Sequence, residues 1–195
     1  GISAKGEPDL EKWKSFLYRL KNPLTEVNIG LVGKYVELKD AYKSISEAFI
    51  HAGAATQCKV KIKWIHSEKL EDNPDCIQEE LQGLNGILVA PGFGSRGIEG
   101  KIMAVRYARE NKIPFLGICL GMQCAVIEFA RNVLGYKDAH SVEMMASTSY
   151  PVIDMMEEQK LIQNMGGTMR LGAYPCKLKE NTKIYSAYQK ENISE

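Results

Sequence analysis

The sequence has no marked excess of either charge and no long apolar run. Its 195 residues carry 25 Lys and Arg against 24 Asp and Glu, a net charge of +1, so we expect no basic surface and no nucleic-acid partner. The longest apolar stretches, 86–90 and 113–120, are far shorter than the about 20 residues that span a bilayer. The first ten residues, GISAKGEPDL, lack the layout of a signal peptide. We therefore expect no membrane partner.

Cysteine is scarce, and its spacing forms no recognised framework. The five cysteines, at positions 58, 76, 119, 124 and 176, include no CxxC pair and leave an odd one over. This pattern argues against a disulfide scaffold or a metal site and favours free thiols in a reducing, cytoplasmic setting. The length suits one domain with an appendage.

Short apolar segments alternate with amphipathic ones along the chain. We expect strands at 27–32, 60–65 (at a sheet edge), 86–90 and 114–118, with weaker strand signals at 151–156 and 173–178. Helical spacing occurs at 10–20, at 41–52 with Asp40 as its N-cap, at 99–111 and after residue 119. The alternation predicts an α/β fold: an open, mostly parallel twisted sheet with helices on both faces, flavodoxin-like in kind.

Cys119 lies between two glycines where a strand pattern ends and a helical pattern begins. The stretch Gly117-Ile-Cys-Leu-Gly121 has the spacing of a nucleophile elbow, in which glycines permit a crowded turn and leave the nucleophile exposed. A helix N-terminus favours the thiolate, which is the reactive form of cysteine. A buried structural cysteine is the plainer alternative, but two glycines at this spacing favour a nucleophile. The other four cysteines lack this context and are interpreted as structural.

A glycine-rich loop, 91–97, follows the strand before the elbow. Parallel strands end at the same sheet edge, so this loop is expected beside Cys119. Nucleophilic attack on a carbonyl requires N–H donors for the oxyanion, and the Gly92 and Leu120 amides are the natural candidates. The loop also matches GxGxxG, but it follows the third strand and no acidic residue ends the next one, so a dinucleotide site is disfavoured.

These motifs resemble the class I, or triad, glutamine amidotransferases. Further segments are similar to the glutaminase domains of the CTP synthase family, namely 32–35 (VGKY), 40–45 (DAYKSI), 97–101 (GIEGK), 125–131 (AVIEFAR) and 165–172 (MGGTMRLG). The resemblance runs from about residue 7 to residue 188. It implies that residues 1–24 are a linker helix from a synthase domain and that residues 25–195 are an amidotransferase domain, incomplete at its C-terminus.

The resemblance implies a role for each residue near the elbow. Cys119 would attack the side-chain amide of L-glutamine, releasing ammonia and leaving a γ-glutamyl thioester that water cleaves. Gly92 and Leu120 would line the oxyanion hole. Gln123 and Glu143 would bind the amino-acid end of glutamine, Glu143 through the ammonium group. Without the resemblance, Glu143 would be interpreted as an ordinary solvated acid and Gln123 as a polar residue on a helix face.

The family also implies partners and regulation. Ammonia would pass to a synthase domain in cis that uses ATP and Mg to aminate UTP, in an enzyme that forms homo-oligomers, with no cofactor in the present domain. Phe93, Arg96, Glu99 and Arg170 would belong to a lid region through which GTP activates the family. Pro91 stands where the family has glycine, and since proline has no N–H, Gly92 is the donor that matters.

The general base is the missing part of the expected site. The family completes its triad with a histidine and a glutamate two residues apart, whereas this sequence ends at Ile193-Ser-Glu195. His51 and His66 precede the nucleophile; His140 follows it and is the alternative base. We expect the base to lie beyond residue 195, so that these residues alone are alkylated at Cys119 but nearly inactive.

Two other classes of protein share a cysteine at such a turn. A redox or deglycating protein of the DJ-1/PfpI type would place an acid near the thiol from the first strand–helix turn, where Glu37 fits poorly. A non-catalytic flavodoxin-like interaction module would have the elbow only as a packing feature. Labelling of Cys119 by a glutamine analogue would distinguish an amidotransferase from both.

Overall fold

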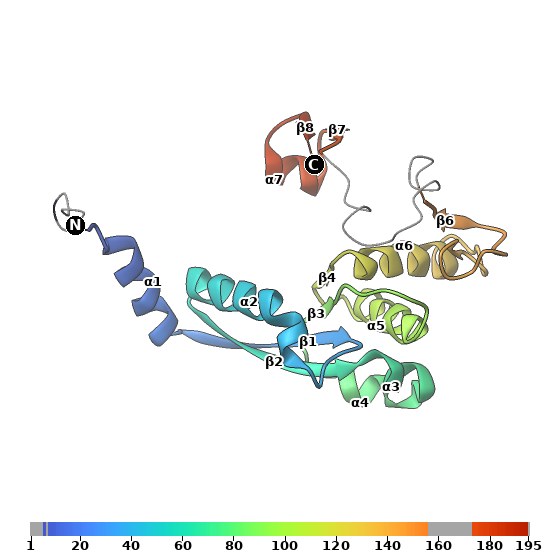
Figure 1. The fold of residues 1–195 in the computed structure, drawn as a ribbon, viewed down its shortest axis with the longest axis horizontal. Coiled ribbons are helices and arrows are strands. Elements are labelled where there is room, and N and C mark those ends of the chain that lie inside the picture. The colour runs from blue at the N-terminus through green and yellow to red at the C-terminus, as the bar shows by residue number, and fades with distance from the viewer. Residues whose placement is uncertain (1–5, 7, 156–172, 195) are drawn as a thin grey trace, which may run out of the picture. The chain divides into compact units, whose positions relative to one another are not determined.

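The computed structural model describes Gly6 and residues 8–155 and 173–194. The chain divides into two compact units, Gly1–Asp154 and Met155–Glu195. The first unit contains the sheet drawn in blue to green in Figure 1. The second contains an antiparallel pair, β7 (Pro175–Lys177) and β8 (Asn192–Ser194), and the short helix α7 (Lys183–Tyr188), whose Thr182 hydroxyl accepts the Tyr185 N–H. The predicted domain boundaries at 24/25 stay a prediction.

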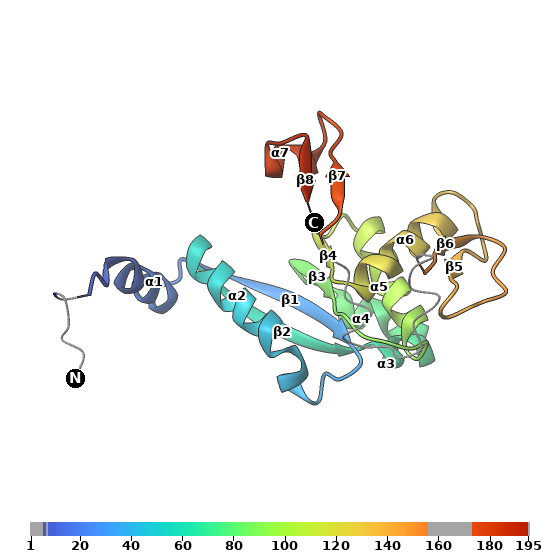
Figure 2. The same cartoon turned by 45° about the horizontal axis from the view of Figure 1, so that its top comes forward.

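Four parallel strands form the sheet of the first unit. They are β1 (Thr25–Gly33), β2 (Cys58–His66), β3 (Gly86–Val89) and β4 (Phe115–Gly117), in the order β2-β1-β3-β4. The two long strands and the two short ones lie side by side in Figure 2, and every pairing between neighbours is parallel. The four expected strands are therefore confirmed, including the edge position of β2.

Side chains alternate between two hydrophobic clusters on the two faces of this sheet. Leu31 and Leu88 pack with residues of α2 (Lys43–Thr56) on one face. Val32 and Val89 pack on the other face with α5 (Ile98–Glu110) and α6 (Leu120–Asn132). Strands with both faces buried are typical of a parallel sheet covered by helices. The predicted α/β fold with helices on both faces is confirmed.

Several smaller elements differ from what the sequence predicts. Asp40 lies inside a 3-10 turn, η1 (Lys39–Tyr42), and α2 begins at Lys43 without a side-chain cap, so the expected cap is wrong. Residues 67–81 form α3 (Ser67–Asp72), η2 (Pro74–Cys76) and α4 (Ile77–Leu81), which the sequence pattern did not predict. Beyond α6, β5 (His140–Ser141) pairs in parallel with β6 (Pro151–Ile153).

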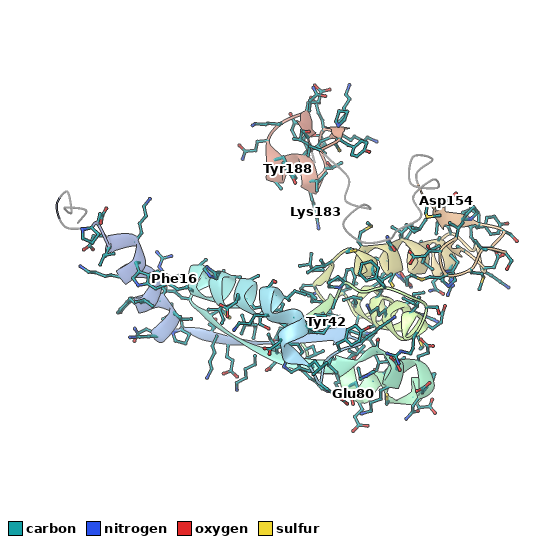
Figure 3. All side chains as sticks on the ribbon, viewed as in Figure 1. Phe16, Tyr42, Glu80, Asp154, Lys183 and Tyr188 are labelled. Atoms are coloured by element: carbon teal, nitrogen blue, oxygen red, sulfur yellow. The ribbon has the colours of Figure 1, made fainter. Side chains whose placement is uncertain are left out.

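The N-terminal helix α1 (Glu11–Lys21) confirms the expected amphipathic segment. It contacts α2, and the Phe16 ring, labelled in Figure 3, lies 5.2 Å from the imidazole of His51 between ring centroids. Among the residues that the structure describes, no helix combines the length and apolarity needed to cross a membrane.

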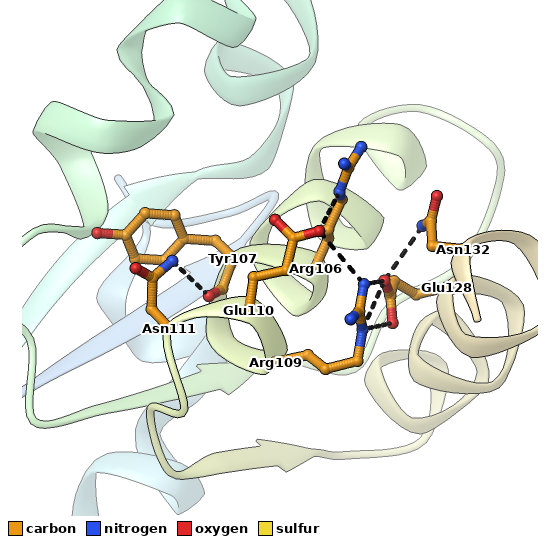
Figure 4. Close-up of polar contacts among 7 residues, drawn as sticks. All are labelled: Arg106, Tyr107, Arg109, Glu110, Asn111, Glu128 and Asn132. Carbon is orange, nitrogen blue, oxygen red and sulfur yellow. Dashed lines mark hydrogen bonds and ion pairs between the residues drawn. The ribbon is translucent and has the colours of Figure 1, made fainter.

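A buried carboxylate joins α5 to α6, the helix that follows the elbow. Glu128 is 1% exposed and accepts bonds of 3.0 Å from Arg109 Nε and 2.8 Å from Arg109 Nη2. Asn132 Nδ2 donates to the same carboxylate at 3.1 Å, as Figure 4 shows. A bidentate, charge-assisted pair of this kind fixes the relative orientation of the two side chains as well as their distance. It therefore sets how α6 lies against α5.

The Arg109–Glu128 ion pair should contribute far more to the free energy of unfolding than the exposed pair between Arg106 and Glu110. Arg109→Met leaves the Glu128 carboxylate buried without its cation, so we expect a loss of about 2–3 kcal/mol in the free energy of unfolding. The matched control is Arg106→Met, which removes the exposed pair to Glu110 and should cost less than about 0.5 kcal/mol. Urea denaturation measures both. Equal losses in the two variants would contradict the assigned role.

Candidate active site

Cys119 occupies a strained turn between β4 and α6. It is the N-cap residue of α6, with φ 53° and ψ −110°, and its side chain is exposed. Gln57 also has positive φ, but its ψ of 40° is ordinary left-handed backbone. A residue held outside the favoured regions costs about 1–3 kcal/mol and persists only where the surrounding structure fixes it. Such backbone is what a nucleophile elbow requires.

Both glycines of the elbow are required by close backbone contacts. A Cβ on Gly121 would lie 2.1 Å from the Val89 carbonyl oxygen at the end of β3, and one on Gly117 would lie 2.6 Å from the backbone of Gly121. No side chain other than hydrogen fits at either place. The predicted crowded turn is thus present, and it presses the start of α6 against the end of β3.

The loop after β3 lies against the first turn of α6. A Cβ on Gly92 would meet the Leu120 side chain at 3.7 Å, which places the loop beside the elbow as the parallel sheet predicts. Within the turn, the Gly121 amide donates to Ile118 O and the Gln123 amide to Cys119 O. The Leu120 amide is the first of the helix, where N–H groups have no intrahelical acceptor. The two residues expected to donate to an oxyanion, Gly92 and Leu120, therefore lie on adjoining segments.

Two buried lysines hold this loop by its carbonyl groups. Lys101 of α5 donates to Ala90 O at 2.9 Å, and Lys34 donates to Phe93 O at 2.6 Å and to Gly94 O at 3.0 Å. The sequence pattern alone gave neither lysine a role. A signal was present for Lys101, because it falls three residues after Ile98, on the apolar face of its helix.

Burial changes the protonation of these groups. Desolvation lowers the pKa of Lys101 from 10.5 to about 8, and it also lowers the pKa of Lys34, where the nearby Arg96 charge acts in the same direction. Burial raises the pKa of the Cys124 thiol to about 11, so that this cysteine stays protonated. A protonated thiol in the core fits the structural role expected of Cys124.

Comparison with known proteins agrees with this geometry. The family model of the class-I glutamine amidotransferases matches residues 37–194. The chain belongs to this family. It is 68% identical over its whole length to the CTP synthase of Cytophaga hutchinsonii and 60% identical over 97% of its length to that of Methanocaldococcus jannaschii.

A solved structure of the family aligns closely. The Trypanosoma brucei CTPS glutaminase domain with bound acivicin has a TM-score of 0.74 and 34% identity, covering 87% of this chain and 65% of that one. The chain spans 36% of the length of the two CTP synthases above. Membership of the amidotransferase family disfavours the two alternatives, a redox protein and a non-catalytic module.

The residues expected to bind glutamine come from two segments of this amidotransferase fold. Gln123 is half-buried in the first turn of α6, and Glu143 is exposed, with its amide donating to Ser141 Oγ at 3.3 Å. The next residue, Met144, packs on the hydrophobic cluster that contains Leu120. The segment with Glu143 is thereby attached to the same core as the elbow, while its role in binding stays a prediction.

The residues expected in the lid region have different environments. Phe93 is 83% exposed, and Arg96 pairs with Glu68 at 2.9 Å. Glu99 instead pairs with Arg131 of α6 at 2.8 Å. Arg170 lies outside the described residues. An aromatic ring turned fully into solvent is available to a ligand, whereas Glu99 ties the start of α5 to the end of α6.

His140, the alternative base, faces groups other than the elbow. Its Nδ1 accepts the Ser141 N–H at 2.9 Å, and its Nε2 lies 3.7 Å from the Glu99 carboxylate. Burial, and then the Arg131 charge, lower its pKa. These contacts favour a structural histidine. Among the described residues, no cluster of His, Cys, Asp and Glu is arranged to hold a metal ion.

The elbow glycines give a clear steric prediction. Gly121→Ala should destabilise the fold by at least about 3 kcal/mol or prevent folding, because its Cβ overlaps the Val89 carbonyl. The matched control is Gly92→Ala, whose Cβ meets its neighbours at ordinary distances of 3.5 and 3.7 Å, and which should remain folded. Thermal unfolding followed by circular dichroism compares the two. A stable Gly121→Ala protein would refute the close contact.

The buried Lys101 ammonium predicts a rise in stability at alkaline pH. Its pKa is about 8 when folded and 10.5 ordinarily, so between these values the unfolded chain binds the proton more tightly and stability increases with pH. The free energy of unfolding should rise by on the order of 2 kcal/mol over this range because of Lys101. Denaturation of the wild type and Lys101→Met at several pH values measures the difference. The same rise in both proteins would contradict the assignment.

Proposed function

We propose that this chain is the glutaminase domain of a CTP synthase. One observation supports the proposal above the rest: an exposed cysteine at a strained elbow, beside a glycine loop and the first amide of a helix. CTP synthases are among its relatives, at 60–68% identity. The substrate of this domain is L-glutamine, and its product is ammonia for the amination of UTP to CTP.

The proposed chemistry begins with Cys119. Its thiolate attacks the side-chain amide carbon of glutamine, and the carbonyl oxygen becomes an oxyanion that the Gly92 and Leu120 amides stabilise by hydrogen bonds. Collapse of this intermediate releases ammonia, with a proton supplied to the leaving nitrogen, and leaves a γ-glutamyl thioester. Water then cleaves the thioester, giving glutamate and the free thiol. Gln123 and Glu143 hold the amino-acid end of the substrate throughout.

Proton transfers in these steps need a base within hydrogen-bond reach of the thiol. The resemblance to the family assigns this role to a histidine and a glutamate that stand two residues apart. Ammonia is consumed by a synthase domain in cis that binds UTP, ATP and Mg. We assign GTP activation to the lid region with Phe93, Arg96, Glu99 and Arg170, and expect a homo-oligomeric enzyme of the cytoplasm.

A single substitution separates the two activities of such an enzyme. In the complete polypeptide, Cys119→Ser should reduce glutamine-dependent CTP formation at least about 10³-fold, while CTP formation from added ammonium salt should be unchanged. Cys176→Ser, which alters another exposed cysteine, is the control and should affect neither. Spectrophotometric assay of CTP with each nitrogen source makes the measurement. Undiminished use of glutamine by Cys119→Ser would sink the proposal.

A further inference from the structure

The Ala90–Gly94 loop rests on two ammonium groups that the mechanism above does not use. We propose that Lys34 and Lys101 are positioning residues, which hold this loop so that the Gly92 amide faces the oxyanion formed at Cys119. The inference rests on the proposed glutamine hydrolysis and names the groups that shape its oxyanion hole.

Lys101 fixes the beginning of the loop. Its side chain is fully buried, and Nζ donates to Ala90 O, the last carbonyl before Pro91. A Cβ on Gly92 would lie 3.5 Å from the same nitrogen, so the ammonium group lies directly beside Gly92. The charge is therefore close to the peptide that is expected to bind the oxyanion.

Lys34 fixes the other end. Its Nζ donates to the carbonyls of Phe93 and Gly94. Its backbone is held as well, because the Lys34 amide donates at 3.1 Å to the hydroxyl of Tyr42, a buried residue labelled in Figure 3. A Cβ on Gly33 would lie 2.4 Å from that hydroxyl, so glycine is needed for the tyrosine to reach the end of β1.

Gly92 thus lies between two anchored points. The Ala90 carbonyl is bound on one side and the Phe93 carbonyl on the other, which restricts rotation of the two peptide groups between them. Since Pro91 has no N–H, the Gly92 amide is the first available donor after Ala90. An oxyanion hole requires donors that are oriented before the reaction, because reorientation during it would raise the barrier.

The choice of lysine rather than a neutral donor also has a physical consequence. A hydrogen bond from an ammonium group is stronger than one from a neutral group. Burial disfavours both charges, as the lowered pKa values of Lys34 and Lys101 show, and such perturbed groups are concentrated at functional sites.

The test uses Lys34→Met and Lys101→Met in the complete polypeptide, which keep side-chain length and remove the charge and the donors. The control is Lys137→Met, at an exposed position. Steady-state glutamine hydrolysis gives kcat and KM. Alkylation of Cys119 by iodoacetamide gives a second readout, since displacement of iodide forms no oxyanion and depends only on an accessible thiolate.

We expect kcat to fall about 10²-fold in both lysine variants, with KM and the alkylation rate changed by less than about threefold and the control unchanged. An unaltered kcat would overturn the inference, and so would equal losses of kcat and alkylation, which would indicate a displaced elbow. Should Lys101→Met fail to fold, Lys34→Met decides alone. Absence of glutamine hydrolysis in the wild type would overturn the proposed function itself, and this inference with it.

Discussion

The contact between Gly121 and the Val89 carbonyl is the constraint on which the rest of the site depends. A Cβ added to Gly121 would lie only 2.1 Å from the Val89 carbonyl oxygen. The first turn of α6 therefore packs on the end of β3 as closely as backbone atoms allow. Cys119 is forced into its strained conformation because the chain must turn within two residues between β4 and this helix. The same contact brings Leu120 beside the loop that leaves β3. One close approach therefore brings together Cys119, Leu120 and the loop that contains Gly92, the residues to which we assign the nucleophile and the oxyanion donors.

Charged side chains also fix the arrangement of α5, α6 and the loop between β3 and α5. Glu128 with Arg109 fixes α6 against α5, and the exposed Glu99 at the start of α5 pairs with Arg131 at the end of α6. Lys34 and Lys101 bind the loop between β3 and α5. Glu128, Lys34 and Lys101 are buried, and a buried ion is expensive unless a partner is held in a defined geometry. These groups therefore restrict the arrangement of helices and loop in a way that apolar packing, which is non-directional, does not.

Much of the fold follows from the sequence because its signals are local. The four strands are short apolar runs, and the helices after them carry regular apolar spacing, so their positions and the parallel sheet were predicted correctly. Helices α3 and α4 were missed because six and five residues give too little periodicity. The predicted Asp40 cap was wrong because the chain makes a 3-10 turn there before α2 begins. Lys101 was overlooked because a lysine within an apolar face has no partner until the fold supplies one.

The sequence by itself determined the elbow: two glycines around Cys119 at a strand–helix junction specify an exposed cysteine in a strained turn through local backbone geometry alone. It also determined the family, since several motifs at fixed positions carry the resemblance. Only the tertiary structure decided what surrounds Cys119. The lysines that bind the loop come from two separate parts of the chain: Lys34 directly follows β1, 60 residues before Gly94, and Lys101 lies on α5, 11 residues after Ala90. Their hydrogen bonds to the loop form because the sheet and α5 bring the two lysines next to it. No local sequence pattern encodes this proximity.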